Sequence, residues 1–239
     1  MTLPFTIQIP VYNETQALAF SAFYFERLGV HPRYVLDSQR TPAAQAMLEH
    51  LGHEPLFFSN DKPFIENGYQ NFASVSPTDW ILRLDCDETP SRDLIAFCDD
   101  FVRRDCAGVV GFERHQVLWN GDHFLTAGAP RLAPVAQRQW RLFNRARVKF
   151  DRQIHTPGIH VENPIAAPSA AALYHLSWVF LTWEDRLKKA ARYDDHGQPS
   201  FNRANQLFPV DDAEWTTLDA MFLRDAYADW LADRAPHLN

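Results

Sequence analysis

Residues 80 to 90 read Trp80-Ile-Leu-Arg-Leu-Asp85-Cys86-Asp87-Glu88-Thr89-Pro90, an apolar run that ends in three acids. The apolar part predicts a short strand, and the Thr-Pro pair after the acids predicts the start of a helix. Asp85 and Asp87 are two positions apart, so both side chains can turn toward one ligand. Carboxylate oxygens at a strand end suit Mg²⁺ or Mn²⁺, with phosphate oxygens completing the coordination shell. The alternative is an acidic turn in which Asp87 or Thr89 only caps the next helix.

The chain before these acids alternates between strand-like and helix-like segments. Apolar runs predict strands at 5–10, 34–36 and 55–58, and apolar residues at helical spacing predict helices at 15–28, 42–52 and 65–75. Strands that alternate with helices in this way predict a parallel, doubly wound arrangement with both sheet faces covered. We therefore expect an α/β fold, with a Rossmann-like mixed sheet flanked by helices.

The second half of the chain changes character. We expect helices at 91–104, 182–194 and 212–233, strands at 109–119, 139–143 and 173–178, and a loop through the Gly/Ala/Pro-rich stretch up to residue 134. Residues 1–195 are expected to form one domain. Residues 196–239 are expected to form a linker, rich in Gly, Pro, Asn and Gln, and a C-terminal amphipathic helix packed on that domain.

The composition argues against some classes of partner and location. The 239 residues carry a net charge of −7, which argues against non-specific binding to nucleic acid or acidic membranes. No apolar run approaches the roughly 18 residues of a transmembrane span, and the first residues do not resemble a signal peptide. Three cysteines without zinc-like spacing favour free thiols in a reducing compartment. These features predict a cytoplasmic protein with no transmembrane segment.

Asp37 follows the predicted second strand, a position where an acid commonly contacts the sugar or base of a nucleotide. An Asx-type turn with Ser38 explains the same residue equally well. The chain has no G-x-G-x-x-G motif after its first strand and no G-x-x-x-x-G-K-[ST] motif. These absences argue against dinucleotide-dependent dehydrogenases and P-loop proteins.

A cluster of basic residues lies in the second half of this acidic chain. It consists of Arg138, Arg141, Arg145, Arg147, Lys149 and Arg152. Guanidinium groups bind phosphate through two hydrogen bonds, and Arg141, Arg145 and Arg147 would share one face of a strand. The cluster predicts a groove for a departing diphosphate, with Arg141 as the leading candidate. The alternative is a solvated face with ordinary surface ion pairs.

Two parts of the chain offer histidines for chemistry. His155 and His160 bracket Pro157 and Gly158, in a loop suited to closing over a ligand. His175 ends a Leu-Tyr-His segment, where its imidazole can add a nitrogen to a metal held by carboxylates. The alternative for His175 is a hydrogen-bonded packing residue.

Three segments together resemble the family 2 glycosyltransferases. They are, in order, Ile9-Pro10-Val11-Tyr12-Asn13-Glu14, Leu36-Asp37-Ser38 and the run from Trp80 to Glu88. Arg141-Leu142-Phe143, followed by His155, is also similar to a later segment of short bacterial members. The resemblance covers residues 4–195 and implies the A-type glycosyltransferase fold, whose sheet binds a nucleotide, followed here by a C-terminal helical extension.

The resemblance implies transfer of a sugar from a UDP-, GDP- or dTDP-sugar to a hydroxyl of a saccharide or glycolipid acceptor, in surface polysaccharide or glycoconjugate synthesis. It implies that Asp37 and Asp85 contact the nucleotide. It also implies that Asp87 ligates Mn²⁺ or Mg²⁺, with His175 completing the metal site. The other donor-binding residues that the matched motifs imply are Pro10, Tyr12, Glu14, Asn71 and Arg141, although Gln70 stands where the family has an arginine before its asparagine.

The chain departs from the family at the catalytic base. Many inverting members carry a catalytic Asp, often in a Glu-Asp pair, ahead of the late basic segment, and no such pair lies between Gly121 and Arg141. Asp122 and His155 are the available substitutes. His155 ranks first because imidazole titrates near neutral pH, which suits a general base. The stereochemical course of transfer is left open.

Two other classes of function remain as alternatives. A nucleotidyltransferase that makes nucleotide sugars also uses strand-end acids and a divalent ion, but the chain lacks the glycine-rich basic loop expected early in such enzymes. A catalytically silent nucleotide-sugar-binding protein is the second alternative, with the C-terminal helix as its docking element.

Overall fold

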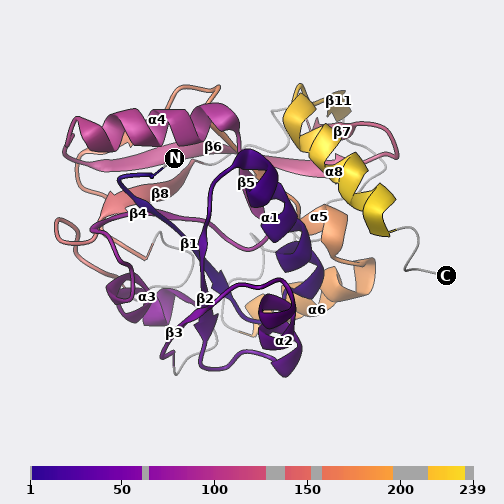
Figure 1. Cartoon of the computed structure of the whole chain (residues 1–239), viewed down its shortest axis with the longest axis horizontal. Coiled ribbons are helices and arrows are strands. Elements are labelled where there is room, and N and C mark those ends of the chain that lie inside the picture. The colour runs from indigo at the N-terminus through magenta and orange to yellow at the C-terminus, as the bar shows by residue number, and fades with distance from the viewer. Residues whose placement is uncertain (1, 61–64, 128–137, 152–157, 196–214, 235–239) are drawn as a thin grey trace.

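The computed structural model of the chain describes residues 2–60, 65–127, 138–151, 158–195 and 215–234 (Figure 1). Its strands are β1 (Thr6–Val11), β2 (Arg33–Asp37), β3 (Leu56–Phe58), β4 (Trp80–Arg83), β5 (Glu88–Pro90), β6 (Val109–Trp119), β7 (Phe124–Ala127), β8 (Gln139–Asn144), β9 (Pro164–Ala166), β10 (Ala172–His175) and β11 (Trp215–Thr217). Its helices are α1 (Thr15–Leu28), α2 (Pro42–His50), α3 (Ile65–Ser74), α4 (Arg92–Arg103), α5 (Ser177–Phe180), α6 (Trp183–Asp194) and α8 (Met221–Arg234). The strands form a mixed sheet with the order β11-β7-β6-β8-β4-β1-β2-β3 along its main path, and helices flank it. The expected α/β fold class is confirmed.

The first four strands form the parallel half of the sheet. β1 pairs in parallel with β2 and with β4, and β2 pairs in parallel with β3. Successive side chains of β4 point to opposite faces. Trp80 and Leu82 enter a buried cluster with α1, α2 and α4, whereas Ile81 enters a second cluster with α3. Helices thus cover both faces, which is why these strands are apolar without polar alternation.

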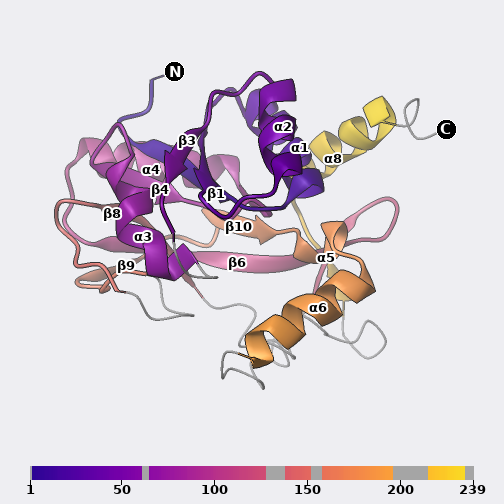
Figure 2. The ribbon, with the colours of Figure 1, turned by 90° about the horizontal axis from the view of Figure 1, so that it is seen from below.

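The second half of the sheet is mixed and is built around the long strand β6. β8 lies between β4 and β6 and is antiparallel to both, although it follows both in the chain. β6 changes register between Val110 and Gly111 and continues past β8, where it pairs with β10 and β7 (Figure 2). β10 pairs on its other side with β5. This pairing fixes the acidic segment after β4 against residues from much later in the chain.

N-cap residues mark the starts of α2 and α4, and the start of α2 is the predicted one. α2 begins with Thr41 as its N-cap and Pro42 as its first residue. The N-cap of α4 is Ser91, whose Oγ accepts the N–H of Leu94 at 3.1 Å. The alternative that Asp87 or Thr89 caps this helix is therefore wrong. The Thr-Pro pair belongs to β5 instead of opening a helix, because β10 supplies it with a strand partner.

Two predictions about strands were wrong in part. Residues 124–127, expected in a loop, form β7, because the turn after β6 brings them back against that strand. The strand expected at 173–178 ends at His175, and the chain enters the short helix α5 at Ser177. In both cases the pairing partner decides the outcome, and a local sequence pattern does not contain that partner.

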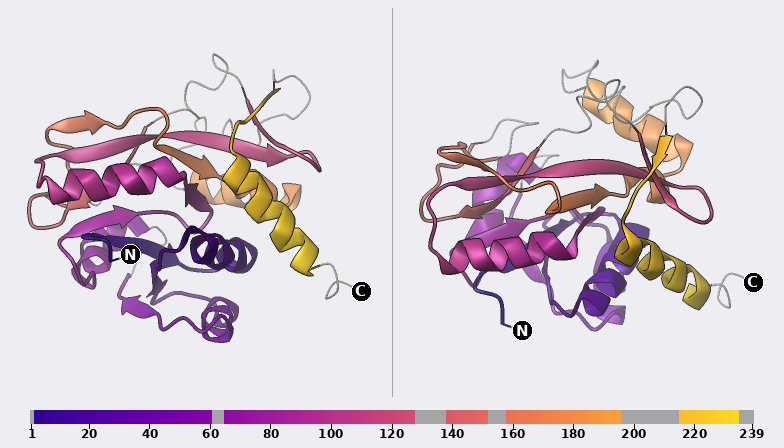
Figure 3. Two further views of the ribbon diagram at one scale, coloured as in Figure 1. Left: turned by 45° about the horizontal axis from the view of Figure 1, so that its top comes forward. Right: turned by 90° about the horizontal axis from the view of Figure 1, so that it is seen from above.

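The C-terminal helix is shorter than predicted. It begins at Met221 rather than at residue 212, after the edge strand β11. α8 packs on α1 (Figure 3), with 5.4 Å between the ring centroids of Phe20 and Trp230. The linker predicted at 196–209 lies outside the described residues, so the two-part division of the chain stays a prediction. Within the described ranges no helix has the length and apolar character needed to span a membrane.

Gly158 lies where a side chain would meet a buried ring. Its φ is +74°, and a Cβ built on it would lie 2.8 Å from Cγ of Tyr69. Tyr69 is 1% exposed and packs on Phe72 and Phe143, so its ring has no room to move aside. We expect Gly158→Ala to lower the free energy of unfolding by about 2–4 kcal/mol, through left-handed backbone strain and overpacking.

Urea denaturation measures this loss, with Gly52→Ala as the matched control. Gly52 has a φ of +72° but no heavy atom within 4 Å of the added Cβ. The control therefore carries the backbone strain alone, about 1–2 kcal/mol. Equal losses in the two variants would contradict the overpacking of Tyr69.

Candidate functional site

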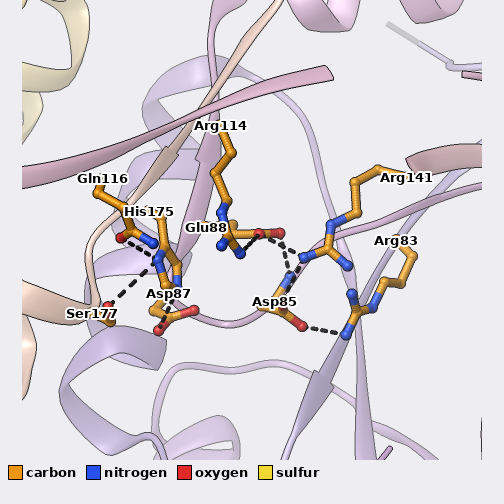
Figure 4. Close-up of polar contacts among 9 residues, drawn as sticks. All are labelled: Arg83, Asp85, Asp87, Glu88, Arg114, Gln116, Arg141, His175 and Ser177. Carbon is orange, nitrogen blue, oxygen red and sulfur yellow. Dashed lines mark hydrogen bonds and ion pairs between the residues drawn. The ribbon is translucent and has the colours of Figure 1, made fainter. Parts of the chain in front are cut away.

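The acidic segment between β4 and β5 lies at the carboxyl ends of the parallel strands, where α/β proteins place their ligands. The pairing of β5 with β10 puts Glu88 opposite His175. On the other side of β10, Gln116 of β6 is in register with His175. The sheet thereby brings together side chains from three separate parts of the chain (Figure 4).

Asp87 and His175 face each other at this edge of the sheet. Asp87 Oδ2 lies 3.2 Å from His175 Nε2, and the side chains are 15% and 9% exposed. Nδ1 of the same ring donates to Oε1 of Gln116, and Ser177 Oγ lies 3.5 Å from it. Because Nδ1 donates, a neutral imidazole keeps its lone pair on Nε2, the atom that faces the carboxylate.

The charge states of the pair follow from their surroundings. Burial alone would raise the pKa of Asp87, but His175 and, farther away, Lys189 and Arg114 hold that pKa well below its usual range. Burial lowers the pKa of His175, although the Asp87 carboxylate opposes this change. At neutral pH the site therefore presents a carboxylate and a neutral imidazole. These are the protonation states in which the two side chains bind metal ions.

The pair fits a divalent cation. With the ring proton on Nδ1, as the contact with the Gln116 amide oxygen requires, Asp87 Oδ2 and His175 Nε2 would both offer lone pairs to a cation held between them. In the ranges that the structure describes, no group of three or more His, Cys, Asp or Glu side chains is arranged to hold a metal ion. The protein would therefore supply two ligands here, and phosphate oxygens and water would supply the others.

Asp85 has a different set of partners. Its carboxylate is ion-paired with Arg83 and lies 2.6 Å from Nη2 of Arg141. The same nitrogen lies 2.6 Å from Oε1 of Glu88, whose side chain is fully buried and whose Oε2 accepts the N–H of Asp85. Arg114 adds a third guanidinium, with Nη1 3.5 Å from Glu88 Oε1. Two acids and three arginines thus form a network beside the Asp87–His175 pair.

The arginines of this network have N–H donors that the two acids do not accept. The Nε atoms of Arg114 and Arg141 are buried and have no hydrogen-bond partner among the described residues. Burial, and after it the charge of Asp85, raise the pKa of Glu88. Three guanidinium groups around two acids leave positive charge next to the Asp87–His175 pair, which suits an anionic group such as a phosphate.

The segment after β1 folds the side chain of Glu14 back onto its own backbone. Glu14 Oε2 accepts the backbone N–H groups of Tyr12 at 3.0 Å and Asn13 at 2.9 Å, which closes the turn between β1 and α1. Burial raises the pKa of Glu14, its backbone hydrogen bonds oppose the rise, and the Asp87 carboxylate adds to it. Pro10 is half-buried in β1, and Tyr12 is 36% exposed. Glu14 therefore lies within electrostatic reach of Asp87.

Asp37 ends β2 and uses both of its carboxylate oxygens. Oδ1 accepts the N–H of Gln39 at 2.8 Å, and Oδ2 accepts the side-chain amide of Asn60 at 2.9 Å. The first of these contacts is an Asx-type turn. Asn71 of α3 donates its amide to the carbonyl of Ser59 at 2.9 Å. The roles of Asp37 and Asn71 toward a nucleotide stay predictions.

The two candidates for the catalytic base lie apart from these contacts. Asp122 lies in the exposed turn after β6, with its carboxylate 2.9 Å from Nε2 of His123. His155 lies outside the described residues. The role of each as a general base stays a prediction.

Of the two alternatives for the basic cluster, the groove of three arginines is wrong, because Arg141 alone of the three enters the site. The alternative of surface ion pairs holds for Arg145 and Arg147. Arg145 pairs with Asp79 at 3.1 Å and donates to carbonyl groups at the end of α3 and just after it. Arg147 pairs with Asp105 at 2.8 Å. β8 ends before Arg145, so the strand alternation that would align the three side chains stops short.

The sequence-based prediction missed four residues of the site, namely Arg83, Glu88, Arg114 and Gln116. Three of them are polar side chains on strands that are otherwise largely buried. Arg83 ends the apolar strand β4, and Arg114 and Gln116 lie in the polar run 113–116 in the middle of β6. A buried polar group costs free energy unless it is paired, so this pattern indicates an internal partner. It does not indicate which partner.

No protein-family model matches the chain, and no curated protein matches it. Among solved structures, the chain is similar to S. aureus TarS 1–349, with a TM-score of 0.47 and 11% sequence identity over 96% of this chain and 71% of that one. The complex of TarS 1–349 with UDP-GlcNAc gives a TM-score of 0.46 and 11% identity over 96% and 72%. CMP:2-keto-3-deoxy-manno-octonic acid synthetase complexed with CTP gives 0.36 and 10% over 96% and 99%. Likenesses this distant carry no argument about function.

Proposed function

We propose that this protein is a metal-dependent glycosyltransferase that moves a sugar from a nucleotide-sugar donor to a hydroxyl of a saccharide or glycolipid acceptor. The observation that carries the proposal is the pair formed by Asp87 Oδ2 and His175 Nε2, 3.2 Å apart at the carboxyl edge of a parallel sheet. The resemblance of three sequence segments to family 2 glycosyltransferases supports the same assignment.

Asp87 and His175 would hold the cation in this proposal. When bound, Mn²⁺ or Mg²⁺ supplies Lewis-acid stabilisation of the charge that develops on the departing diphosphate. The imidazole nitrogen favours Mn²⁺, because Mg²⁺ takes mostly oxygen ligands. Gln116 orients the His175 ring and fixes its tautomer through the hydrogen bond to Nδ1.

We assign the diphosphate to the arginines beside this pair. Arg141 lies within 2.6 Å of both Asp85 and Glu88, and Arg114 approaches Glu88 from β6. Their positive charge would stabilise the diphosphate as it leaves the anomeric carbon. Asp85, held in place by two arginines, would then contact the ribose.

The nucleotide and the acceptor complete the assignment. Asp37, at the carboxyl end of β2, would contact the nucleotide, with Pro10, Tyr12, Glu14 and Asn71 nearby in the matched motifs. A general base must take the proton of the acceptor hydroxyl as the new bond forms. His155 and, after it, Asp122 are the residues proposed for that step.

Thermal unfolding with a panel of UDP-, GDP- and dTDP-sugars tests the proposal, each with Mn²⁺ and with EDTA. One nucleotide class should raise the midpoint by about 5–10 °C at a hundredfold excess over its dissociation constant, in the presence of Mn²⁺ only. The stabilising donor is then incubated with saccharide acceptors. The expected products are the free nucleoside diphosphate and a glycosylated acceptor.

The same assay separates the competing classes of function. Consumption of the donor that depends on added pyrophosphate would make the protein a nucleotidyltransferase. Mn²⁺-dependent binding without consumption of any donor would make it a nucleotide-sugar-binding protein. Stabilisation that is equal in Mn²⁺ and in EDTA would remove the metal from the proposal.

A further inference from the structure

A second cavity lies behind the strand that carries His175. Successive residues of β10 point to opposite faces, so His175 faces Asp87 whereas Tyr174 points into the cluster between α1 and α8. There, Tyr174 lines a cavity of about 250 Å³ together with Tyr24, Arg92, Asp219 and Phe222. We call it the β10 cavity. Pockets for drug-sized ligands measure roughly 300–1,000 Å³, so this volume suits a smaller ligand.

The β10 cavity contains a tyrosine hydroxyl group that has no hydrogen-bond partner among the described residues. Tyr174 is 8% exposed, yet its hydroxyl makes no hydrogen bond to any residue that the structure describes. Burial, and then the charges of Asp219 and Asp93, raise the pKa of Tyr174, so the hydroxyl stays protonated at neutral pH. Tyr24 differs, because its hydroxyl donates to the carbonyl of Pro90 at 2.6 Å. The Tyr174 hydroxyl is therefore a donor and acceptor available to a ligand.

Charged groups of both signs stand at the rim of the β10 cavity. Asp219 and Arg92 are exposed, and neither is hydrogen-bonded to another described residue. The Arg92 guanidinium lies over one face of the Phe222 ring, 4.2 Å from its centroid. A carboxylate and a guanidinium at one opening disfavour a ligand with strong net charge of either sign.

The start of α8 adds backbone donors to this wall. Arg224 donates its N–H to the carbonyl of Ala220, so Ala220 occupies the N-cap position. Alanine has no side-chain acceptor with which to cap the N–H groups of the first turn. Residues 221–223 carry those groups and line the β10 cavity.

We propose that the β10 cavity binds one neutral saccharide ring. Aromatic side chains give the C–H faces of such a ring an apolar surface, and Tyr24 and Phe222 supply it with an edge-to-face contact at 5.3 Å. The hydroxyls of the ring both donate and accept. They match the Asp219 carboxylate, the Arg92 guanidinium and the free hydroxyl of Tyr174. The inference uses no residue assigned to the diphosphate or the metal, so it stands independently of the proposed transfer.

Titration of ¹⁵N-labelled protein with glucose, galactose, mannose and N-acetylglucosamine tests this inference. At least one sugar should shift the backbone resonances of Tyr174 and of residues 220–223 in a saturable manner. Tyr174→Phe removes only the hydroxyl and should weaken binding about tenfold, the effect of one lost hydrogen bond. Asp219→Asn, at an exposed position where folding is not at risk, should weaken binding by a similar factor.

Two control variants locate the binding. Asp225→Asn alters an exposed acid of α8 that pairs with Arg224, and it should leave the affinity unchanged. Asp87→Ala alters the metal-binding pair on the other face of β10 and should also leave it unchanged. The inference is overturned if no sugar gives saturable shifts, or if Tyr174→Phe and Asp219→Asn bind as tightly as the native chain. It is also overturned if inorganic phosphate produces the same shifts at lower concentration, because the cavity would then select anions.

Discussion

Asp87→Asn is expected to lower the Mn²⁺-stimulated affinity for the nucleotide-sugar donor by at least about 100-fold, since even supporting residues of a metal site contribute roughly 10–100-fold. The substitution keeps the shape of the side chain and removes its negative charge. His175 Nε2 would then face a neutral amide, and the cation would lose its one charged protein ligand in the pair. Isothermal titration calorimetry of the donor, with Mn²⁺ and with EDTA, measures the change. Transferase activity should fall with the affinity.

Asp100→Asn is the matched control for this variant. Asp100 is an acid of α4 whose side chain is 62% exposed and pairs with Arg104. Its replacement changes the net charge equally but should leave the Mn²⁺ effect intact. His175→Ala should show a smaller loss than Asp87→Asn, about tenfold, because a neutral ligand is removed. Equal Mn²⁺ stimulation in Asp87→Asn and Asp100→Asn would remove Asp87 from the metal site.

Above the raised pKa of Glu88, Arg141→Met is expected to destabilise the protein by about 3–5 kcal/mol, because it then leaves a buried carboxylate without its closest counter-ion. Arg141 is 4% exposed, and its Nη2 lies 2.6 Å from Glu88 Oε1 and 2.6 Å from Asp85 Oδ2. The Glu88 side chain is fully buried and cannot turn to solvent. Methionine keeps most of the length of the side chain, so the loss reports on charge and hydrogen bonding. Urea denaturation measures it.

The loss in Arg141→Met should also depend on pH. The pKa of Glu88 is raised in the folded protein. When the pH rises above the ordinary pKa of a glutamate, the unfolded chain therefore loses this proton while the folded chain still holds it. Removing the guanidinium raises that pKa further. The loss of unfolding free energy in Arg141→Met should therefore be larger at about pH 8 than at about pH 5. At the lower pH Glu88 is protonated and needs no counter-ion.

Arg147→Met is the matched control, because Arg147 belongs to the same basic cluster of the sequence. It pairs with Asp105 at 2.8 Å, but the two side chains are 45% and 64% exposed. Exposed ion pairs contribute about 0–1 kcal/mol, so this variant should be nearly as stable as the native chain. Similar losses in Arg141→Met and Arg147→Met would show that the buried network does not hold this part of the fold.

The sequence was sufficient to predict elements whose causes are local. The helix Thr15–Leu28 and the strand Val109–Trp119 have the predicted bounds, because apolar spacing and turn residues mark their ends. The short strands Glu88–Pro90, Pro164–Ala166 and Trp215–Thr217 were not predicted. Each is three residues long, and two of them contain proline. Such segments become strands only because a distant strand offers hydrogen bonds to them.

The candidate site shows the same division between local and distant causes. The prediction grouped Asp87 with His175, and the structure places them side by side, whereas their binding of a metal ion stays a prediction. The sequence did not reveal that Asp85 pairs with two arginines, or that Gln116 holds the imidazole. Those contacts arise from the register of β6 against β10 and from the insertion of β8. Neither feature has a local signature.

The position of β8 between β4 and β6 also sets the order in which the protein can be completed at the ribosome. β4 and β6 are synthesised first, and the edge of β4 stays open until residues 139–144 emerge. Arg141 lies on this later strand, and His175 is synthesised later still. Until then, Asp85 lacks the contact with Arg141 and Asp87 lacks the contact with His175. A product truncated before β8 would expose an unpaired strand edge, which invites aggregation. Premature termination should therefore yield a substrate for chaperones and proteases instead of a partly assembled site.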